Sequence, residues 1–359
     1  MRVLHVTEAL GGGIQSAIAN YVDGLTEVEH SMFARARGGQ ATHAVESGLV
    51  SNEEYSGGLA GFFARLRAKV REERPDIVHL HSSFAGVARA VLPRGQRVVY
   101  SPHCYAMERR DVALPLRWSY GAVEYLLARR PQVTVAVSPR EAEISARLNG
   151  RTPAQVVLNP SPFVGAQFAD AQFAHAEPDD AGVVTGEVIM VGRISPQKDP
   201  ELFAKVARAF DEDDVQFSWI GDGDAEERSA LEDAGVTVSG WIPPHELRRR
   251  LENAALYLHT AAWEGGPVST IEAASLGVPI LSRTIPSMRS LGYPLAGETP
   301  QQLAVNVRRF FADPQFSARV SATSASLAAT ASKPAMATAL RAAYASAMTR
   351  ASRGRPSAR

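Results

Sequence analysis

Residues 187–198 read Glu-Val-Ile-Met-Val-Gly-Arg-Ile-Ser-Pro-Gln-Lys, and this stretch contains the repeating unit of the fold. The apolar run Glu187–Val191 predicts a buried strand, the glycine after it predicts a turn, and the helical pattern Pro200–Phe210 follows. A strand, a turn and a helix form the repeating unit of a parallel α/β sheet. A long stretch without this pattern precedes residue 187, so a second series of strand–turn–helix units begins here. The chain therefore predicts two such sheets in tandem.

Short apolar runs alternate with longer helical patterns on both sides of the break, and the helical patterns include Gly61–Glu73 and Leu116–Arg130. The predicted strands are Val3–Thr7, Ser31–Ala36, Ile77–His81, Val98–Ser101, Val133–Ser138 and Gln155–Leu158, then Glu187–Val191, Val215–Ile220, Val236–Ser239, Leu256–His259 and Val278–Ser282. Ligands of doubly wound sheets bind beyond the carboxyl ends of the strands. The residues that follow each strand are therefore the candidates for function.

We predict an N-terminal Rossmann-like domain over residues 1–165, a linker over 166–186 and a C-terminal Rossmann-like domain over 187–340. The length of 359 residues suits two domains. Prolines, glycines and acidic residues mark the linker. An alanine-rich helix is expected at about 335–350, so residues 341–359 comprise its end and a basic tail that we expect to be disordered.

The composition is that of a soluble globular protein, with 45% hydrophobic and 21% charged residues. No apolar run approaches the roughly 20 residues that cross a bilayer. The chain starts with a strand-like stretch rather than a signal peptide, and its single cysteine, Cys104, excludes an internal disulfide and a cysteine-rich metal site. We therefore expect a cytoplasmic enzyme.

The net charge of zero hides an asymmetry. Residues 1–165 hold 19 Lys and Arg against 15 Asp and Glu, whereas residues 166–340 hold 14 against 23. The last 19 residues hold five arginines and no acid. A basic first half and tail suggest an anionic partner surface, although a distributed surface charge is the simpler interpretation of the counts. Nucleic acid is not expected, because no aromatic-studded strands or recognition helix accompany the arginines.

The predicted helix at 59–71 sets Phe62, Leu66 and Val70 at four-residue spacing beside several cations. A helix that lies on an anionic membrane has this pattern, and so does a helix packed on a Rossmann sheet. Both interpretations stay open at this point.

The stretch Trp263-Glu-Gly-Gly-Pro-Val-Ser-Thr-Ile-Glu-Ala-Ala-Ser-Leu-Gly277 carries the strongest chemical pattern. We expect Pro267 at the first helical position and Gly277 at the end of the helix. The first-turn amides then lack backbone partners and, with the helix dipole, form an anion site. These amides belong to Val268, Ser269 and Thr270.

Two carboxylates, Glu264 and Glu272, stand eight residues apart in this stretch. Eight helical residues span about 12 Å, beyond the roughly 5 Å of a retaining glycosidase pair. The pair therefore suits two different hydroxyl groups of one ligand. Gly265 and Gly266 permit the close backbone approach that a phosphate or a sugar needs. A glycine-capped helix with two solvated acids explains the same residues without a ligand.

A basic pair follows the strand at 187–191. Gly192 makes a turn, and Arg193 and Lys198 are placed to converge on one phosphate group, the arginine as a fork and the lysine as a point charge. Surface salt bridges are the alternative role for both cations.

These two stretches resemble the E-x7-E and G-R-x4-K motifs of retaining glycosyltransferases of the GT-B fold, specifically glycosyltransferase family 4. The resemblance spans roughly residues 1–345 and implies an α/β protein in which two Rossmann-like, doubly wound domains face each other across a cleft. It implies that Glu264 contacts hydroxyls of the donor sugar and that Glu272 holds the ribose. Arg193 and Lys198 would neutralise the departing diphosphate.

Further residues match the family in the expected order. Gly221, in Ile220-Gly-Asp-Gly-Asp224, resembles the glycine loop on the nucleotide side. Trp241 and Ile242 resemble the strand that meets the nucleobase, and core packing is the alternative role of Trp241. Asp222-Gly-Asp224 lacks the later ligands of a calcium loop, and enzymes of this family use no D-x-D metal. We therefore expect no metal site.

Glycines follow the first strand, in Gly11-Gly-Gly13, and a helix is expected to open at about Ile14. No Gly-Lys-Ser/Thr follows them, so they do not form a P-loop, and they do not complete a dinucleotide fingerprint. In the family this loop, with Gly12 and Gly13, faces the donor phosphates and the acceptor.

His103 ends the strand that runs into Ser101-Pro-His103. The family often carries a histidine here that touches the donor sugar, and an ordinary strand-end histidine is the alternative. We interpret His79 and His81, which flank another strand end, as structural.

The resemblance implies a retaining, metal-independent glycosyltransferase that needs no cofactor beyond its nucleoside-diphosphate-sugar donor, with a UDP-sugar favoured over a GDP-sugar. The expected acceptor is lipid-linked or a saccharide, in bacterial surface polysaccharide or glycolipid assembly. An anionic membrane surface is a further expected partner, with the enzyme peripheral on the inner face of the cell membrane. A GT-B-fold nucleotide-sugar 2-epimerase and a non-catalytic sugar-nucleotide-binding subunit remain alternatives. An NADP-dependent oxidoreductase that uses Arg35 and Arg37 is a further alternative.

Overall fold

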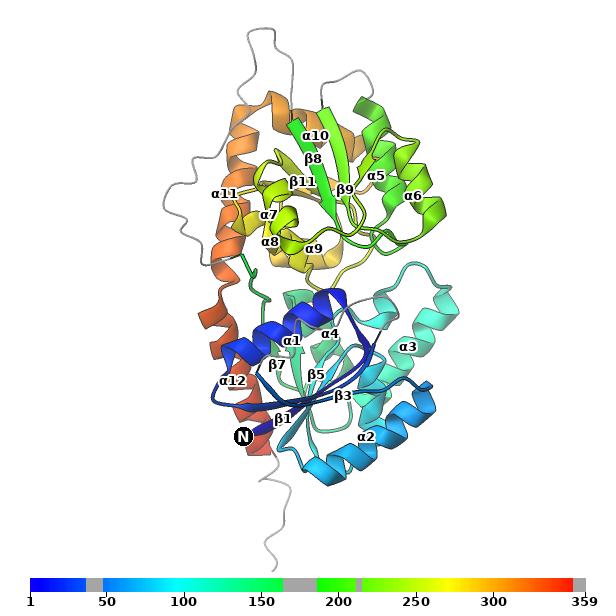
Figure 1. The fold of residues 1–359 in the computed structure, drawn as a ribbon, viewed down its shortest axis with the longest axis vertical. Helices are drawn as coiled ribbons and strands as arrows, with labels where there is room; N and C mark the ends of the chain where they lie inside the picture. The colour runs from blue at the N-terminus through cyan, green and yellow to red at the C-terminus, as the bar shows by residue number, and fades with distance from the viewer. Residues whose placement is uncertain (37–47, 164–185, 211–214, 351–359) are drawn as a thin grey trace, which may run out of the picture. The chain divides into compact units, whose positions relative to one another are not determined.

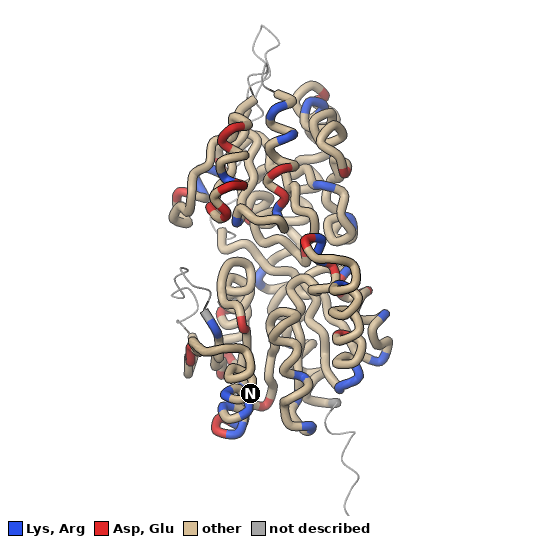
Figure 2. Tube along the Cα trace, turned by 90° about the vertical axis from the view of Figure 1, so that its right-hand side faces the viewer, with Lys and Arg blue, Asp and Glu red and all other residues tan. Residues whose placement is uncertain are grey.

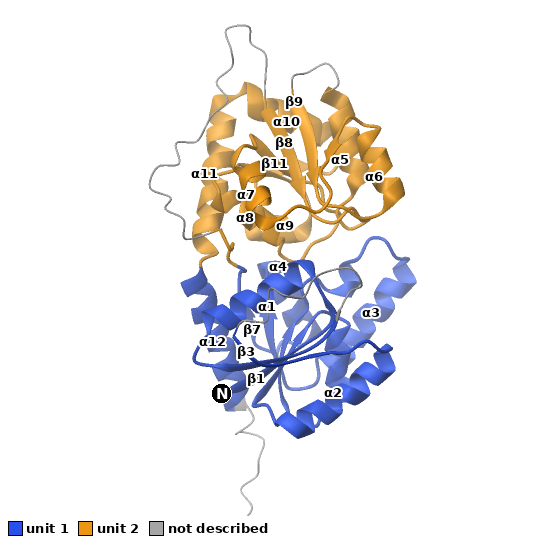
Figure 3. Cartoon of the chain, in the orientation of Figure 1, with its two compact units in different colours: residues 1–159, 333–359 blue, residues 160–332 orange. Residues whose placement is uncertain are grey.

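The computed structural model describes residues 1–36, 48–163, 186–210 and 215–350. The chain forms two compact units (Figure 3). Unit 1 comprises Met1–Asn159 and Lys333–Arg359, and unit 2 comprises Pro160–Ser332. All but the last residue of the predicted linker, and the tail after residue 350, lie outside the described residues.

Unit 1 is built on a seven-stranded sheet in the order β3-β2-β1-β4-β5-β6-β7, and every neighbouring pair is parallel. The strands are β1 (Arg2–Leu10), β2 (Glu29–Ala36), β3 (Leu49–Glu54), β4 (Ile77–His81), β5 (Arg97–Ser101), β6 (Val133–Ala136) and β7 (Ala154–Val156). The helical segments are α1 (Gly12–Gly24), α2 (Leu59–Glu73), η2 (Ala85–Ala90), η3 (Ala106–Glu108), α3 (Leu114–Leu127), α4 (Pro139–Leu148) and α12 (Lys333–Arg350). Figure 1 shows helices on both faces of this sheet.

Unit 2 has a six-stranded parallel sheet in the order β10-β9-β8-β11-β12-β13. Its strands are β8 (Gly186–Val191), β9 (Val215–Ile220), β10 (Thr237–Val238), β11 (Leu256–His259), β12 (Ile280–Arg283) and β13 (Leu295–Gly297). Its helices are α5 (Pro200–Ala207), η4 (Arg208–Phe210), α6 (Ala225–Glu232), α7 (Pro244–Glu252), α8 (Val268–Ser275), α9 (Pro286–Leu291), α10 (Pro300–Ala312) and α11 (Pro314–Thr330). The predicted fold class, two Rossmann-like α/β domains, is confirmed.

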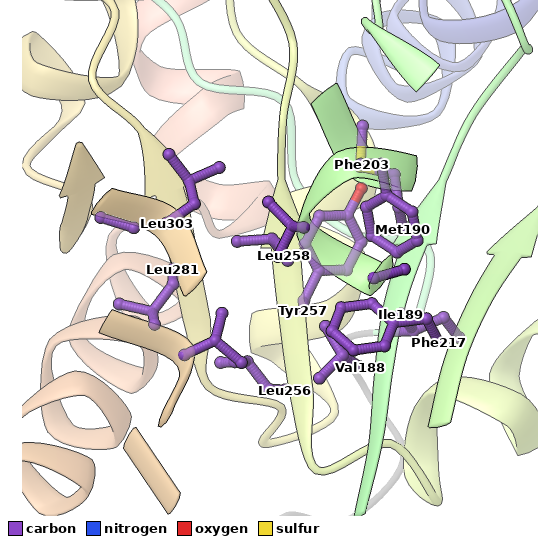
Figure 4. Packing of buried hydrophobic residues seen from close by; sticks show 14 of the residues in the cluster. Val188, Ile189, Met190, Phe203, Phe217, Leu256, Tyr257, Leu258, Leu281 and Leu303 are labelled. Carbon is purple, nitrogen blue, oxygen red and sulfur yellow. The ribbon is translucent and has the colours of Figure 1, made fainter. Parts of the chain in front are cut away.

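The core of unit 2 explains why its strands read as unbroken apolar runs. Val188, Ile189 and Met190 of β8 pack beside the residues of β11, and all of them are buried (Figure 4). Parallel strands covered on both faces by helices bury every side chain. The two strands that carry this core also lead directly into the loops described below.

The last helix returns to unit 1. Met336, Leu340 and Tyr344 of α12 are buried in one cluster with residues of β1, β4, β5 and β6. The structure therefore ends unit 2 at Ser332, earlier than the predicted boundary at residue 340. In an alanine-rich helix the apolar residues lie on all sides, so the sequence does not indicate which sheet the helix covers.

Two edge strands were missed by the sequence analysis. In β3 at one edge of its sheet, half-buried and exposed residues alternate over a polar sequence, Leu-Val-Ser-Asn-Glu-Glu. The other, β13, has three residues and lies at the edge of the second sheet. Edge strands are often short or polar, and β13 is too short and β3 too polar to show the apolar run that revealed the others.

Helix α2 packs on the sheet. Phe62, Leu66 and Val70 are buried in a core cluster with residues of β1 and β4. The interpretation of this helix as a membrane-binding one is therefore wrong. Acidic and basic residues occur on both units (Figure 2), and no helix in the described part of the chain is long and apolar enough to span a bilayer.

Candidate active site

The two motifs predicted for the second half meet at one point of the unit 2 sheet. Its strand order builds outward from β8 through β9 to β10, then returns to the other side of β8 with β11. The crevice at such a reversal is where doubly wound sheets bind their ligands. The loop at 192–198 follows β8 and the loop at 260–267 follows β11, so both border this crevice.

Four contacts join the two loops. The Lys198 ammonium forms an ion pair with the Glu264 carboxylate. The Thr260 hydroxyl donates to the Lys198 carbonyl at 2.9 Å, the Ala262 amide to the Gln197 carbonyl at 2.9 Å, and the Gln197 side-chain amide to the Trp263 carbonyl at 3.3 Å. Glu264 is only 8% exposed. The sequence assigned Lys198 and Glu264 to different parts of a ligand, whereas the structure pairs them with each other.

Arg193 contrasts with this pair. Its side chain is exposed, and none of the described residues forms an ion pair with it. A guanidinium without a carboxylate partner beside a crevice is available to an anionic ligand.

An ion pair between Asp199 and Arg283 lies next to the loop at 192–198. Asp199 caps α5, with its carboxylate accepting from the Leu202 amide at 3.1 Å, and its other oxygen lies 2.6 Å from Arg283 at the end of β12. The Asp199 backbone is left-handed, with φ at 53°. Sequence analysis missed Arg283, because this residue reaches Asp199 only through the position of β12 in the folded sheet, beside β11.

Helix α8 begins at Val268, so Pro267 is the N-cap residue rather than the first helical residue as predicted. No side chain caps this end. The Thr270 hydroxyl donates to the Pro267 carbonyl at 2.9 Å, so it does not reach the first amides. The half-buried Val268 and Ser269 and the buried Thr270 therefore present an uncapped helix start, the arrangement that attracts anions.

Gly277 ends the helix as predicted, with φ at 83°. The Gly277 amide donates to the Ala274 carbonyl and the Val278 amide to the Ala273 carbonyl, both at 3.1 Å. This is a Schellman motif.

The second carboxylate, Glu272, lies one helical turn further along α8. Burial raises its pKa to about 7, because an enclosed carboxylate loses hydration that no cation replaces. The two acids of the motif therefore differ: Glu264 has a cation beside it, and Glu272 does not. A carboxyl that is half ionised near neutral pH is typical of functional sites.

The glycines after β8 and β9 allow the backbones of the two loops that follow these strands to lie close together. A Cβ on Gly221 would lie 2.1 Å from the Gly192 carbonyl oxygen, and one on Gly223 would lie 2.1 Å from the Ile194 carbonyl oxygen. Buried Trp219 donates from its indole N–H to the same Gly192 carbonyl at 2.9 Å. Gly221 and Gly223 are thus required by the packing of the protein itself, and Gly192 by its φ of 151°.

Asp222 and Asp224 have structural partners. Asp224 caps α6 by accepting from the amides of Glu226 and Glu227, both at 3.0 Å. Asp222 lies 3.2 Å from Arg228.

Trp241 is 60% exposed. Its alternative role in the core is therefore wrong, and it lies at the surface with half-buried Ile242 next to it.

Two residues of β11 near the crevice escaped the sequence analysis. The buried Tyr257 hydroxyl is 2.8 Å from the Ser269 hydroxyl and donates to the Val191 carbonyl at 3.2 Å, so it ties the end of β8 to the start of α8. His259 is fully buried, and neither ring nitrogen has a hydrogen-bond partner among the described residues. Burial, and then the nearby Lys198, lower its pKa well below the usual value.

Unit 1 has its own reversal of strand order, between β1 and β4. Gly11–Gly13 follow β1, and α1 opens at Gly12, two residues before the predicted start. Gly12 has φ at 54°, and a Cβ there would meet nothing within 4 Å. The loop therefore borders open space, and glycine is needed there for its left-handed backbone.

His103 lies in a strained turn after β5. The φ angles of His103 and Cys104 are 48° and 85°, a conformation that costs energy for residues other than glycine. Buried Glu141 holds this turn, since its carboxylate accepts from the Cys104 amide at 2.5 Å and from the Val137 amide at 2.9 Å. His103 is half-buried, and burial lowers its pKa to about 4.

A chain of imidazoles leads to His103 from the interior of unit 1. His30 Nε2 lies 3.1 Å from the Leu25 carbonyl, and the links His30–His5, His5–His81 and His81–His103 measure 2.9, 2.9 and 3.0 Å. Burial lowers the pKa of each of these histidines, so all are neutral.

The direction of this chain follows from the Leu25 carbonyl, which only accepts. His30 must carry its proton on Nε2, so its Nδ1 accepts from His5, and the same choice passes along to His81 and His103. His103 then carries its proton on Nε2 and keeps an accepting Nδ1. Its ring is therefore set to receive a hydrogen bond from a hydroxyl group.

The contacts of His79, at the end of β4, agree with the structural role predicted for it. It lies 2.8 Å from the Ser101 hydroxyl and 3.0 Å from the Tyr344 hydroxyl of α12. In the described part of the chain, His5, His79 and His81 are the group whose ligand atoms come within 4.8 Å of one another. Their ring nitrogens already bond to each other and to these hydroxyls, so neutral histidines need no ion here.

Known proteins share these two units. Residues 11–162 match the model of Glycosyltransferase Family 4, and residues 185–313 match the model of Glycosyl transferases group 1. The Anabaena protein HepE, solved with UDP and glucose, superimposes with a TM-score of 0.75 at 16% identity, over 96% of this chain and all of that chain.

Two relatives are similar in sequence. An uncharacterised 41.2 kDa protein in the cps region of Klebsiella pneumoniae is 22% identical over 80% of this chain and 82% of its own. The Escherichia coli UDP-Gal:alpha-D-GlcNAc-diphosphoundecaprenol alpha-1,3-galactosyltransferase is 25% identical over 60% of this chain and 59% of its own, less than two thirds of that enzyme. With one family model on each unit and the shared two-domain fold, the chain belongs to the GT-B-fold glycosyltransferases that these two models describe.

Proposed function

We propose that the protein transfers a sugar from a nucleoside-diphosphate sugar, with a UDP-sugar favoured over a GDP-sugar, to an acceptor hydroxyl with retention of the anomeric configuration. The observation that carries this proposal is the Lys198–Glu264 ion pair beside the uncapped start of α8. A cation and a helix start at one crevice suit a diphosphate.

Donor binding would exchange the partners of this ion pair. The diphosphate offers Lys198 a stronger anion than one carboxylate, while Arg193 and the amides of α8 complete its coordination. Glu264 then becomes available to accept hydrogen bonds from hydroxyls of the donor sugar. The ion pair thus keeps both groups in place and neutral in sum while the site is empty.

The nucleoside would lie one turn further along α8, beside Glu272. Ionised Glu272 accepts from two ribose hydroxyls, and the exposed face of Trp241, with Ile242 beside it, stacks on the base. The backbone at Gly192 and Gly221 lies at the carboxyl ends of β8 and β9, which sit side by side, so it lines the approach to the phosphates.

Catalysis would be electrostatic. Negative charge develops on the leaving diphosphate, and Arg193, Lys198 and the α8 amides are preorganised to stabilise it. The acceptor attacks from the face that the diphosphate leaves, and a phosphate oxygen takes the acceptor's proton. No divalent ion is needed in this scheme, because cationic side chains supply the positive charge.

Unit 1 would serve the sugar and the acceptor. The accepting Nδ1 of His103 suits a sugar hydroxyl, and the open space beside Gly12 and Gly13 suits the acceptor or the phosphates. The E. coli relative uses a lipid diphosphate acceptor by its name, which supports a lipid-linked or saccharide acceptor in surface polysaccharide or glycolipid assembly. Such an acceptor would bring the enzyme to the inner face of the cell membrane.

The test has two stages. Thermal shifts with UDP, GDP and ADP, and then with their sugars, should identify a UDP-sugar as the stabilising donor. Proton NMR of the purified product made from an α-linked donor should show the coupling of an α linkage. A β linkage would overturn retention, and donor turnover without any acceptor would favour a 2-epimerase.

A further inference from the structure

Helix α3 is inverted relative to an ordinary surface helix. Its large apolar side chains face solvent, whereas helices on globular proteins turn that face to the core. Six of the twelve exposed large hydrophobic residues in the described chain lie on α3. They are Leu114 (57%), Leu116 (43%), Trp118 (73%), Val123 (43%), Tyr125 (49%) and Leu126 (59%).

The inner face of α3 is held by polar contacts. Glu124 is the buried residue of this helix. Its carboxylate lies 2.7 Å from the Arg89 guanidinium and accepts from the Tyr100 hydroxyl at 2.7 Å. The helix packs on η3 and η2 rather than against the strands, and Figure 1 shows it at the outside of unit 1. An apolar outer face of this extent marks a surface that binds a partner.

The charges around this face are basic. Arg110 and Arg129 are exposed, Arg117 is half-buried, and none of the described residues forms an ion pair with them. The acids nearby are already paired: Glu108 with Arg140, Asp111 with Arg109 and Glu124 with Arg89. Arg129 also lies over the Tyr125 ring, 4.5 Å from its centroid. The patch therefore joins apolar side chains with uncompensated positive charge.

This charge decides between two occupants. In a symmetric dimer the same patch meets itself, so the arginines of the two copies would face each other and repel. Anionic phospholipid headgroups instead complement the arginines, while the acyl region takes up the apolar side chains. Trp and Tyr with Leu on one side of a helix are the side chains that favour the membrane interface.

We propose that α3 is the surface by which the protein docks on an anionic lipid bilayer. Trp118, Leu126 and their apolar neighbours enter the boundary between headgroups and acyl chains, and the arginines contact lipid phosphates. At 14 residues the helix is about 21 Å long, shorter than the hydrocarbon core, so it lies in the interface and does not cross it. The proposal rests on the proposed function only in supposing that the acceptor is lipid-linked.

The experiment is sedimentation of the full chain with vesicles. One set is pure phosphatidylcholine, and the other is an equal mixture of phosphatidylcholine and phosphatidylglycerol. We expect binding to the mixed vesicles, a blue shift of tryptophan fluorescence, and weaker binding as salt screens the arginines. Trp118→Ser with Leu126→Ser, and separately Arg110→Gln with Arg129→Gln, should each weaken binding about tenfold or more.

Matched control variants test whether vesicle binding depends on α3 itself or on any exposed apolar residue or arginine. Val305→Ser removes an apolar residue that is 63% exposed on α10, and Arg67→Gln with Arg71→Gln removes two exposed arginines from α2. Both controls should bind vesicles as the wild type does. Circular dichroism checks that each variant is folded.

Three outcomes would overturn the proposal: no binding of the wild type to mixed vesicles, equal binding of the α3 variants, or a concentration-dependent dimer that Trp118→Ser dissociates. Titration of UDP into the same variants tests the proposed function separately. Vesicle binding without UDP binding would reject the donor site and leave the docking surface intact.

Discussion

The two units share a sheet design but differ in what lies at the reversal of strand order. In unit 1, β1 and β4 carry a chain of neutral imidazoles and hydroxyls that ends at His103. In unit 2, β8 and β11 lead to ion pairs and an uncapped helix start. With the same fold, unit 1 thus presents hydrogen-bonding groups that suit the hydroxyls of a ligand, and unit 2 presents positive charge that suits a phosphate. The chemistry belongs to the loops, not to the sheet.

Acid should weaken the imidazole side of this comparison most. Burial lowers the pKa of His5, His79 and His81 well below 6.5, so the folded protein keeps them neutral while the unfolded chain protonates them. Their contribution to stability is present above pH 6.5 and is lost as the pH falls below it. Each imidazole is already half protonated in the unfolded chain at pH 6.5, so each histidine costs about 1 kcal/mol between pH 6.5 and 5.5. The free energy of unfolding should therefore fall by about 3 kcal/mol over this range.

Denaturant unfolding followed at pH 7.5, 6.5 and 5.5 measures this loss. Imidazole nitrogen NMR at pH 6.5 should show neutral rings in the folded protein. A free energy of unfolding that does not change between pH 6.5 and 5.5 would refute the neutral chain.

The two cations of unit 2 should differ in their effect on stability. Lys198→Ala leaves the buried Glu264 carboxylate without its partner and should cost about 1–3 kcal/mol of unfolding free energy. Arg193→Ala removes an exposed side chain and should leave the unfolding free energy unchanged. The double variant Lys198→Ala with Glu264→Ala should recover part of the loss. Equal stability of the two single variants would mean that the ion pair contributes nothing.

Glu272 of α8 should give nucleoside binding a pH dependence. Glu272, with a pKa of about 7, gains a second accepting oxygen as it ionises. The affinity for uridine, which has a ribose and no phosphate, should therefore rise between pH 6 and 8 by less than tenfold. Glu272→Gln should bind uridine more weakly and without this dependence. A pH-dependent affinity retained in Glu272→Gln would assign it to another group.

Chelation should have the smallest effect. After dialysis against EDTA, sugar transfer should continue at the same rate, because Arg193, Lys198 and the α8 amides supply the positive charge. Activity that EDTA abolishes and Mn²⁺ restores would require ligands for an ion, and would reopen the roles of Asp222 and Asp224.

Much of the fold could be predicted from the sequence, because buried parallel strands leave unbroken apolar runs. The ranges Ile77–His81, Val215–Ile220 and Leu256–His259 agree with the structure at both ends. What failed depends on contacts far apart in sequence. Nothing in an alanine-rich helix tells that α12 crosses back to unit 1, and polar edge strands such as β3 lack an apolar run.

The same limit applies to the site. Residue types and spacing singled out Lys198 and Glu264, since both belong to local motifs. Their ion pair depends on β8 and β11 being neighbours, which only the strand order provides. The imidazole chain likewise needs His5, His30 and His81 side by side on three strands. Helix α3 was missed as a surface because an inverted helix has the same apolar content as a buried one.

If unit 2 holds the donor diphosphate, calorimetric titration of UDP and uridine into the wild type and Arg193→Ala should reveal it. The difference between the two ligands isolates the diphosphate. The wild type should bind UDP far more tightly than uridine. Losing a hydrogen-bonded charge costs about 1.5–3 kcal/mol, so Arg193→Ala should bind UDP about 10- to 100-fold more weakly, with its affinity for uridine unchanged. Equal affinity of Arg193→Ala and wild type for UDP would show that Arg193 does not bind the diphosphate and would reject unit 2 as its site.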